Sequence, residues 1–386
     1  MKRTDAKRVG AACLLALLIG VTSSAFANFY EGEISLFDQE MELKLGADIR
    51  ARLTSWDRNV IWPDGSPEVG PSVEYLRVRT RLWGGLTIGE DISVDARLVN
   101  RIHHFSSHFL DPNNQSPGTW EAPDEVIFDQ LKLTVRNLFD MPWSATLGRQ
   151  ALILGNGMVF LEGTPYDQGR TIYFDGVTLR YAGEKDTLTL FGFYNDYEDQ
   201  IPVLDGRDRR LRRGETGTLG AYWTHNFDEN INTDLYYNYT EIDDEFPNTA
   251  ERYHMADENA EIHTVGARVF GSPEAWFDYS LELAGQCGEY GSGSGAADME
   301  GILGDLRFTF KSAKDTPMQP SLLLQYTYFQ GDDPATQDYE GWHPLFAEYP
   351  IFREELIPIL INGNWTNLHQ YRAQANLKLA EGLQLT

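Results

Sequence analysis

The stretch MELKLGADIRARL, residues 41–53, alternates strictly between apolar and polar side chains, with Gly46 as the one neutral even position. A period of two residues is that of a β-strand, in which successive side chains point to opposite faces. Residues 73–88 and 92–103 repeat it, and these runs exceed the five or six residues usual for a strand. Strands of about ten residues or more cross an outer membrane. The predicted fold class is therefore all-β: a transmembrane antiparallel up-and-down β-barrel with a polar face toward its lumen.

Fourteen complete strands are predicted. After 41–56, 73–88 and 92–103 they lie at 125–137, 142–152, 171–182, 186–195, 216–226, 231–241, 261–270, 275–288, 298–310, 320–330 and 366–379. Short and long connections alternate, like the periplasmic turns and extracellular loops of outer-membrane barrels. The long loops 104–124, 196–215 and 331–365 are candidates for folding over or into the pore. A soluble propeller or sandwich is the alternative, but its loops have no reason to alternate in length.

The two ends of the chain differ from the barrel pattern. Residues 1–27 have the basic start, short apolar run and Ala25-Phe26-Ala27 cleavage site of a secretory signal peptide. We expect a periplasmic N-terminal segment over 28–40 and the barrel over 41–386. Residues 383–386 look like the start of a fifteenth strand, and an open sheet edge has no hydrogen-bond partner in lipid. The sequence is therefore predicted to be a fragment, incomplete at its C-terminus.

Arginines gather on the polar face of the first three strands. They are Arg50, Arg52, Arg77, Arg79, Arg81, Arg97 and Arg101. An arginine stays charged, and its planar fork binds a carboxylate through two hydrogen bonds, so such a face could attract an anionic solute. The alternative is a set of ion-pair ladders that only stiffens the wall. The carboxylates available for such pairs are Asp48, Asp95, Asp129 and Asp175.

Several other classes of function find little support. A formal net charge of -26 disfavours nucleic-acid binding, which needs a basic surface. His103, His104, Ser106 and Ser107 have no recognisable acid partner or oxyanion donors, so no catalytic residues and no enzyme activity are predicted. No metal site or cofactor is predicted either. The acidic runs 241–245 and 332–333 could hold Ca²⁺ in extracellular loops, but they lack the spacing of a calcium loop.

Short motifs in the middle of the chain point to a family. They are Gly148-Arg149-Gln150 with Leu152 and Gly155, then Arg170-Thr171 leading to Phe174-Asp175-Gly176-Val177. Together with the arginine-rich early strands, they resemble the alginate-export family of outer-membrane porins. The resemblance implies a monomeric barrel of eighteen strands, of which about four would be missing here, and an electropositive conduit for a polyuronate.

The same resemblance extends the candidate conduit beyond the seven arginines. Its further positions are Lys132, Arg136, Arg149 and Arg180. Among these, Arg149 has an uncertain direction. A straight count from Leu147 would point Arg149 toward lipid unless Gly148 marks a bulge.

The predicted function is a passive channel in the outer membrane of a Gram-negative bacterium. Its arginine-rich lumen would conduct an anionic or polar solute, such as an acidic polysaccharide in alginate-like export. Two alternatives stay open: a porin for uptake of small anions or organic acids, and a surface enzyme or adhesin anchored by the barrel. The expected partners are outer-membrane lipid, lipopolysaccharide and the anionic solute, with no nucleic acid.

Overall fold

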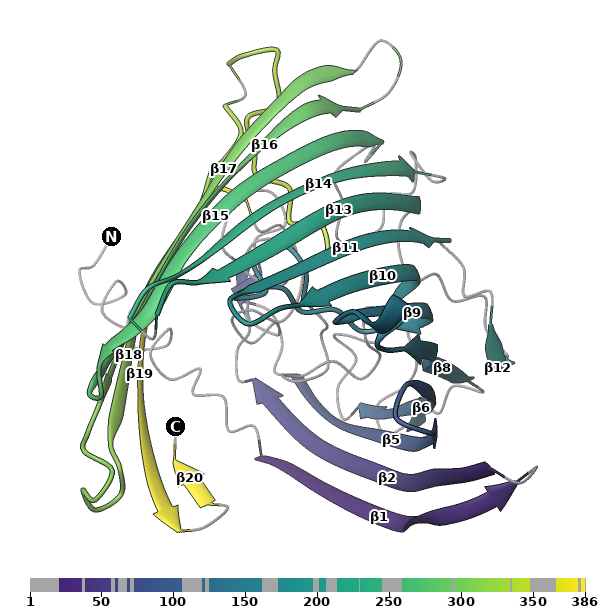
Figure 1. Ribbon diagram of the computed structural model, residues 1–386. Helices are drawn as coiled ribbons and strands as arrows, with labels where there is room; N and C mark the ends of the chain where they lie inside the picture. The colour runs from purple at the N-terminus through teal and green to yellow at the C-terminus, as the bar shows by residue number, and fades with distance from the viewer. Residues whose placement is uncertain are drawn as a thin grey trace.

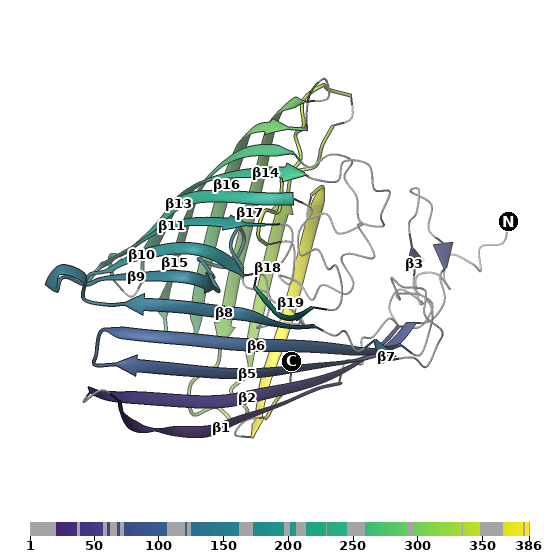
Figure 2. The same ribbon diagram turned by 90° about the vertical axis from the view of Figure 1, so that its right-hand side faces the viewer.

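The computed structural model describes most of the chain. The described residues are 21–36, 39–56, 60–61, 68–69, 73–105, 120–121, 125–161, 173–196, 201–205, 214–228, 230–244, 259–291, 293, 296–333, 335–347, 366–380 and 383–385. Within them no helix is long and apolar enough to cross a membrane. The strands form one curved antiparallel sheet, which Figures 1 and 2 show from two directions.

Sixteen strands pair in chain order. They are β1 (Val21–Leu36), β2 (Gln39–Trp56), β5 (Val73–Ile88), β6 (Ile92–Phe105), β8 (Glu125–Val135), β9 (Trp143–Gln150), β10 (Phe174–Ala182), β11 (Asp186–Asn195), β13 (Gly214–Asn226), β14 (Asn232–Asp244), β15 (Ala260–Glu274), β16 (Phe277–Tyr290), β17 (Ala297–Lys311), β18 (Ser321–Phe329), β19 (Leu368–Ala380) and β20 (Leu383–Leu385). All fourteen predicted strands are confirmed, as is the up-and-down order.

Smaller elements complete the described chain. A short strand β7 (Trp120–Glu121) pairs with the end of β6, and β12 (Pro202–Asp205) pairs with β8. β3 (Val60–Ile61) and β4 (Glu68–Val69) form a separate hairpin, and η1 (Leu138–Asp140) is a 3₁₀ turn before β9. The described parts of the predicted loops 104–124 and 196–215 thus extend the sheet. The rest of these loops lies outside the described residues.

The separate periplasmic segment predicted over residues 28–40 is wrong. Instead of a separate periplasmic segment, Asn28–Leu36 belong to β1, which pairs with β2 along its whole length, and residues 39–40 open β2. Cleavage of the predicted signal peptide after Ala27 would leave the nine residues 28–36 as the first strand. Nine residues suffice for a tilted strand to cross an outer membrane.

The wall separates apolar from polar side chains by alternation. On β2 and β5, Ile49, Leu53 and Leu82 are about half exposed, whereas Arg50 and Arg81 between them are buried. A charge on the lipid face costs about 2–4 kcal/mol at mid-membrane, which explains the apolar outer face. Among the described residues β1 pairs only with β2 and β20 only with β19. The total of eighteen strands stays a prediction.

Two inner segments pack against the inner face of the wall. They are residues 151–161, directly after β9, and residues 335–347, between β18 and β19. Phe160 of the first bridges to Phe346 of the second, with the rings stacked at 4.9 Å between centroids. Inward-facing residues of the wall, such as Phe191 and Leu303, complete this hydrophobic core. The inward fold of 335–347 agrees with the prediction for loop 331–365, whereas 151–161 was not predicted to enter.

Candidate functional site

The arginines of β2, β5 and β6 stand in cross-strand rows on the buried face of the wall. One row is Arg50, Arg79 and Arg101, and the next is Arg52, Arg77 and His103. Neighbouring strands lie about 5 Å apart, so like charges face each other directly in each row. Such pairs are destabilising by themselves. We call the seven arginines of β2, β5 and β6 the arginine face.

Two buried aspartates bind part of the arginine face. Asp48 accepts a hydrogen bond from Arg79 Nη2 at 2.8 Å. Asp129, which is 1% exposed, accepts one from Arg97 Nε at 2.7 Å and lies 3.2 Å from Arg81 Nη2. Burial at this level makes each ion pair dependent on both partners, because a single charge left there would be costly. The arginine face therefore contains local ion pairs as well as rows of like charge.

A β-bulge explains why Asp129 points inward. Leu131 on the same strand is exposed on the outer face, so a period-two count would send Asp129 outward as well. The register shifts there: Arg97 faces Gln130, whereas Leu98 faces Phe128, and Asp129 is the extra residue. An extra residue reverses the alternation beyond it.

Arg149 also turns inward, and Gly148 is the reason. Gly148 adopts φ +110°, and a Cβ on it would lie 2.4 Å from the carbonyl oxygen of Leu131. Beyond it, Arg149 is 2% exposed and donates to both oxygens of Asp175 at 2.8 and 2.7 Å. Its guanidinium also lies 3.6 Å from the centre of the Tyr173 ring. The straight count from Leu147 fails because the backbone is distorted at this glycine.

Substituting Gly148 tests this explanation. We expect Gly148→Ala to lower the free energy of unfolding by about 1–3 kcal/mol, because alanine is strained at this φ and its methyl group meets the Leu131 carbonyl. Urea unfolding in lipid vesicles measures the change. The matched control is Gly304→Ala on β17, where nothing lies within 4 Å of a Cβ. Equal stabilities of the two variants would contradict the explanation.

The remaining predicted conduit residues lie away from the arginine rows. Lys132 is half-buried and faces Asp95 across β6 and β8. Arg136 donates to Ser93 Oγ at 3.2 Å, and Arg180 is exposed. His103 was not predicted as a conduit residue, although its alternation with Arg101 could have shown it. Its Nε2 accepts a hydrogen bond from Arg77 Nε at 3.0 Å.

A second polar cluster lies on the opposite part of the wall, under inner segment 151–161. Asp234, Arg268, Glu282 and Asp305 form one cross-strand row from β14 to β17. Asn156 of the inner segment joins this row, because its Oδ1 accepts from Arg268 Nη1 at 3.0 Å and its Nδ2 donates to Ser280 Oγ at 2.8 Å. The alternation of β16 turns Glu282 inward, but nothing in the sequence indicates Asn156 as a neighbour of this row.

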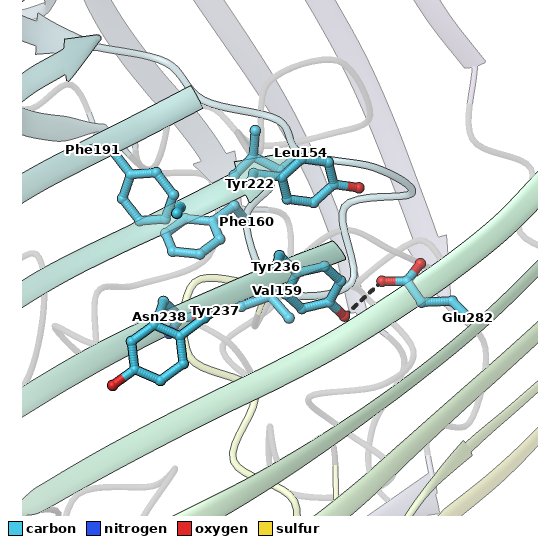
Figure 3. A pocket seen from close by; sticks show the side chains of 10 residues that line it. Leu154, Val159, Phe160, Phe191, Tyr222, Tyr236, Tyr237, Asn238 and Glu282 are labelled. Atoms are coloured by element: carbon cyan, nitrogen blue, oxygen red, sulfur yellow. Dashed lines mark hydrogen bonds between the residues drawn. The ribbon is translucent and has the colours of Figure 1, made fainter. Parts of the chain in front are cut away.

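A small pocket opens between that inner segment and the wall (Figure 3). Leu154, Val159 and Phe160 line one side, and β11, β13, β14 and β16 supply the others. The rings of Tyr222 and Tyr236 stack in parallel at 5.3 Å between centroids. Half of the lining residues are aromatic, and Glu282 supplies the carboxyl group.

The acidic runs considered for calcium lie partly in regular structure. Among the residues that the structure describes, no three His, Cys, Asp or Glu side chains gather as metal ligands would. Glu241, Asp243 and Asp244 belong to β14 instead of a loop. Asp332 and Asp333 accept backbone hydrogen bonds from Glu340 and Ala335.

A curved antiparallel wall that is apolar outside and polar within defines an outer-membrane β-barrel. Comparison with known families agrees: the chain belongs to the alginate export family, whose profile matches residues 41–386. The protein therefore resides in the outer membrane of a Gram-negative bacterium, as the sequence predicted.

Comparisons with single proteins add little to this assignment. The fold resembles a solved structure of OmpT, an outer membrane protein of Vibrio cholerae folded in vitro, in its trimer form. The two are 8% identical, with a TM-score of 0.35 over 83% of this chain and 95% of that one. No curated protein matches the chain. The assignment rests on the family profile.

Proposed function

We propose that this protein is a passive outer-membrane channel whose arginine face guides an acidic polysaccharide across the membrane. The observation that carries the proposal is the pair of cross-strand rows, Arg50–Arg79–Arg101 and Arg52–Arg77–His103. Membership of the alginate export family supports a polyuronate as the solute.

The rows suit a polyanion for an electrostatic reason. Arginines placed directly opposite one another repel, and a passing chain of carboxylates would relieve that repulsion. In a narrow passage with low-dielectric walls, aligned positive charges also concentrate anions at the entrance. Because each guanidinium can exchange one carboxylate for the next, binding stays weak enough for the polymer to move from one row to the next along the strands.

The ion pairs of Asp48 and Asp129 support a second candidate role for part of the arginine face, which is to stiffen the barrel wall. They hold Arg79, Arg81 and Arg97 in fixed positions, as ladders that stiffen a barrel wall would. In the proposed channel the two aspartates orient these arginines and limit how tightly a polyanion binds. Uptake of small anions is the alternative transport function, and the same arginines would serve it. The proposal includes no chemical step, and the channel acts as a monomer.

Conductance across a planar lipid bilayer tests the proposal. We expect the reconstituted protein to conduct ions, and short oligouronates to reduce the current while they occupy the passage. A neutral oligosaccharide of the same length is the control and should reduce the current much less. A protein that inserts but does not conduct would refute the channel. Equal block by the neutral and acidic sugars would refute the role of the arginines.

A further inference from the structure

Glu282 is a buried carboxylate with half of its hydrogen-bonding capacity unused. It is 5% exposed on the inner face of β16. Its Oε1 accepts a hydrogen bond from the Tyr236 hydroxyl at 2.9 Å (Figure 3). Its Oε2 is buried and has no hydrogen-bond partner among the residues that the structure describes. A buried charge without a partner is costly, so something must neutralise it.

The neighbouring cations have other hydrogen-bond partners. Arg268, directly opposite Glu282 on β15, donates through Nε to Asp234 at 2.6 Å and through Nη1 to Asn156. Arg307 donates through Nε to Asp305 at 2.6 Å. On β19, two strands from Asp305, Arg372 hydrogen-bonds Gln374.

Asp305 increases the negative charge beside Glu282. It faces Glu282 directly across β16 and β17 and is fully buried. Its own oxygens already accept hydrogen bonds from Arg307, Gln325 and Thr327. Together with Arg307, which lies in the next row but binds Asp305, two guanidinium groups balance three carboxylates, and one negative charge is left over at Glu282.

The surroundings of Glu282 suit a small cation. The carboxylate lines the pocket beneath inner segment 151–161, beside the tyrosines Tyr222 and Tyr236. Carboxylate and hydroxyl oxygens are the donors that hard metal ions prefer. Gly155 packs so closely that a Cβ on it would lie 2.4 Å from the Tyr222 hydroxyl, which leaves no space for a bulky organic cation there.

We propose that Glu282 binds a single monovalent metal cation, with sodium as the probe, in the pocket beneath inner segment 151–161. One positive charge completes the balance of the three carboxylates Asp234, Glu282 and Asp305 with Arg268 and Arg307. Because Asn156 bonds Arg268 of that row and Ser280 of the next row, the ion also stabilises the attachment of the inner segment to the wall. This inference does not depend on which solute the channel carries.

Thermal unfolding of the whole protein in detergent tests the site. The unfolding temperature is measured in sodium chloride and in choline chloride at equal ionic strength, so that surface charges are screened equally. We expect the wild type to unfold about 2–4 °C higher in sodium, because the ion binds only the folded state. Glu282→Gln keeps the shape and the acceptor for Tyr236 but removes the charge, so its two unfolding temperatures should coincide.

The control is Glu289→Gln on β16, an exposed carboxylate that should leave the sodium effect intact. Equal unfolding temperatures of the wild type in the two salts would overturn the proposal and would mean that a proton neutralises Glu282. A sodium effect that persists in Glu282→Gln would overturn it as well. The wild-type comparison stands by itself if Glu282→Gln does not fold.

Discussion

Replacing Arg77, Arg79 and Arg81 with glutamine will lower the anion preference of the channel. These three residues lie on β5, in the middle of the arginine face, and in the proposed channel each would contribute one positive charge to the passage. A unit charge about 4 Å from a passing anion is worth about 1 kcal/mol even in water. Loss of all three is expected to lower the anion-to-cation permeability ratio by about tenfold or more, measured from reversal potentials in a salt gradient.

The matched control removes positive charge elsewhere. Lys185 and Lys314 are exposed in short turns between strands, so changing both to glutamine should alter the permeability ratio little. Heat-modifiable migration on a gel verifies that each variant folds. If the triple variant folds and keeps the selectivity of the wild type, the arginines are structural ladders and the proposed conduit is wrong.

Loosening the inner segments will raise the conductance severalfold. Phe160 and Phe346 are buried, stacked on each other, and join the two segments at the centre of the inner core. Replacing a buried phenylalanine with a small side chain typically costs about 3–5 kcal/mol of stability. Changing both to serine should detach the segments, because the ring packing that joins them is lost. The wall should persist, because its strand pairings do not involve these two residues. Single-channel recording measures the result.

The control for this experiment is Phe310→Ala, a partly exposed aromatic residue on the outer face of β17. It removes a similar side chain without touching the inner core, so its conductance should equal that of the wild type. A double variant that folds and conducts like the wild type would show that the inner segments do not narrow the passage.

The strands were predictable because alternation is a local property. A polar residue facing lipid is costly. In each strand that crosses the membrane, apolar residues of the lipid face therefore alternate with polar residues of the inner face. The same rule placed Arg50, Arg52 and Arg79 on the inner face. β1 was missed although Tyr30, Gly32, Ile34 and Leu36 alternate with polar residues, because the run after a signal peptide was assigned to a separate segment.

Other features depend on backbone geometry or on contacts between distant residues, and a two-residue alternation encodes neither. The direction of Arg149 follows from the backbone angle of Gly148, and that of Asp129 from one extra residue in β8. The inward fold of residues 151–161 brings Asn156 to Arg268, more than a hundred residues away. No local sequence pattern predicts such a contact.

The sign of the reversal potential of the wild-type channel in a potassium chloride gradient tests the central claim most directly. An arginine face that lines the passage predicts a channel selective for chloride, with a selectivity that weakens as the salt concentration rises and screens the charges. A cation-selective channel would contradict it.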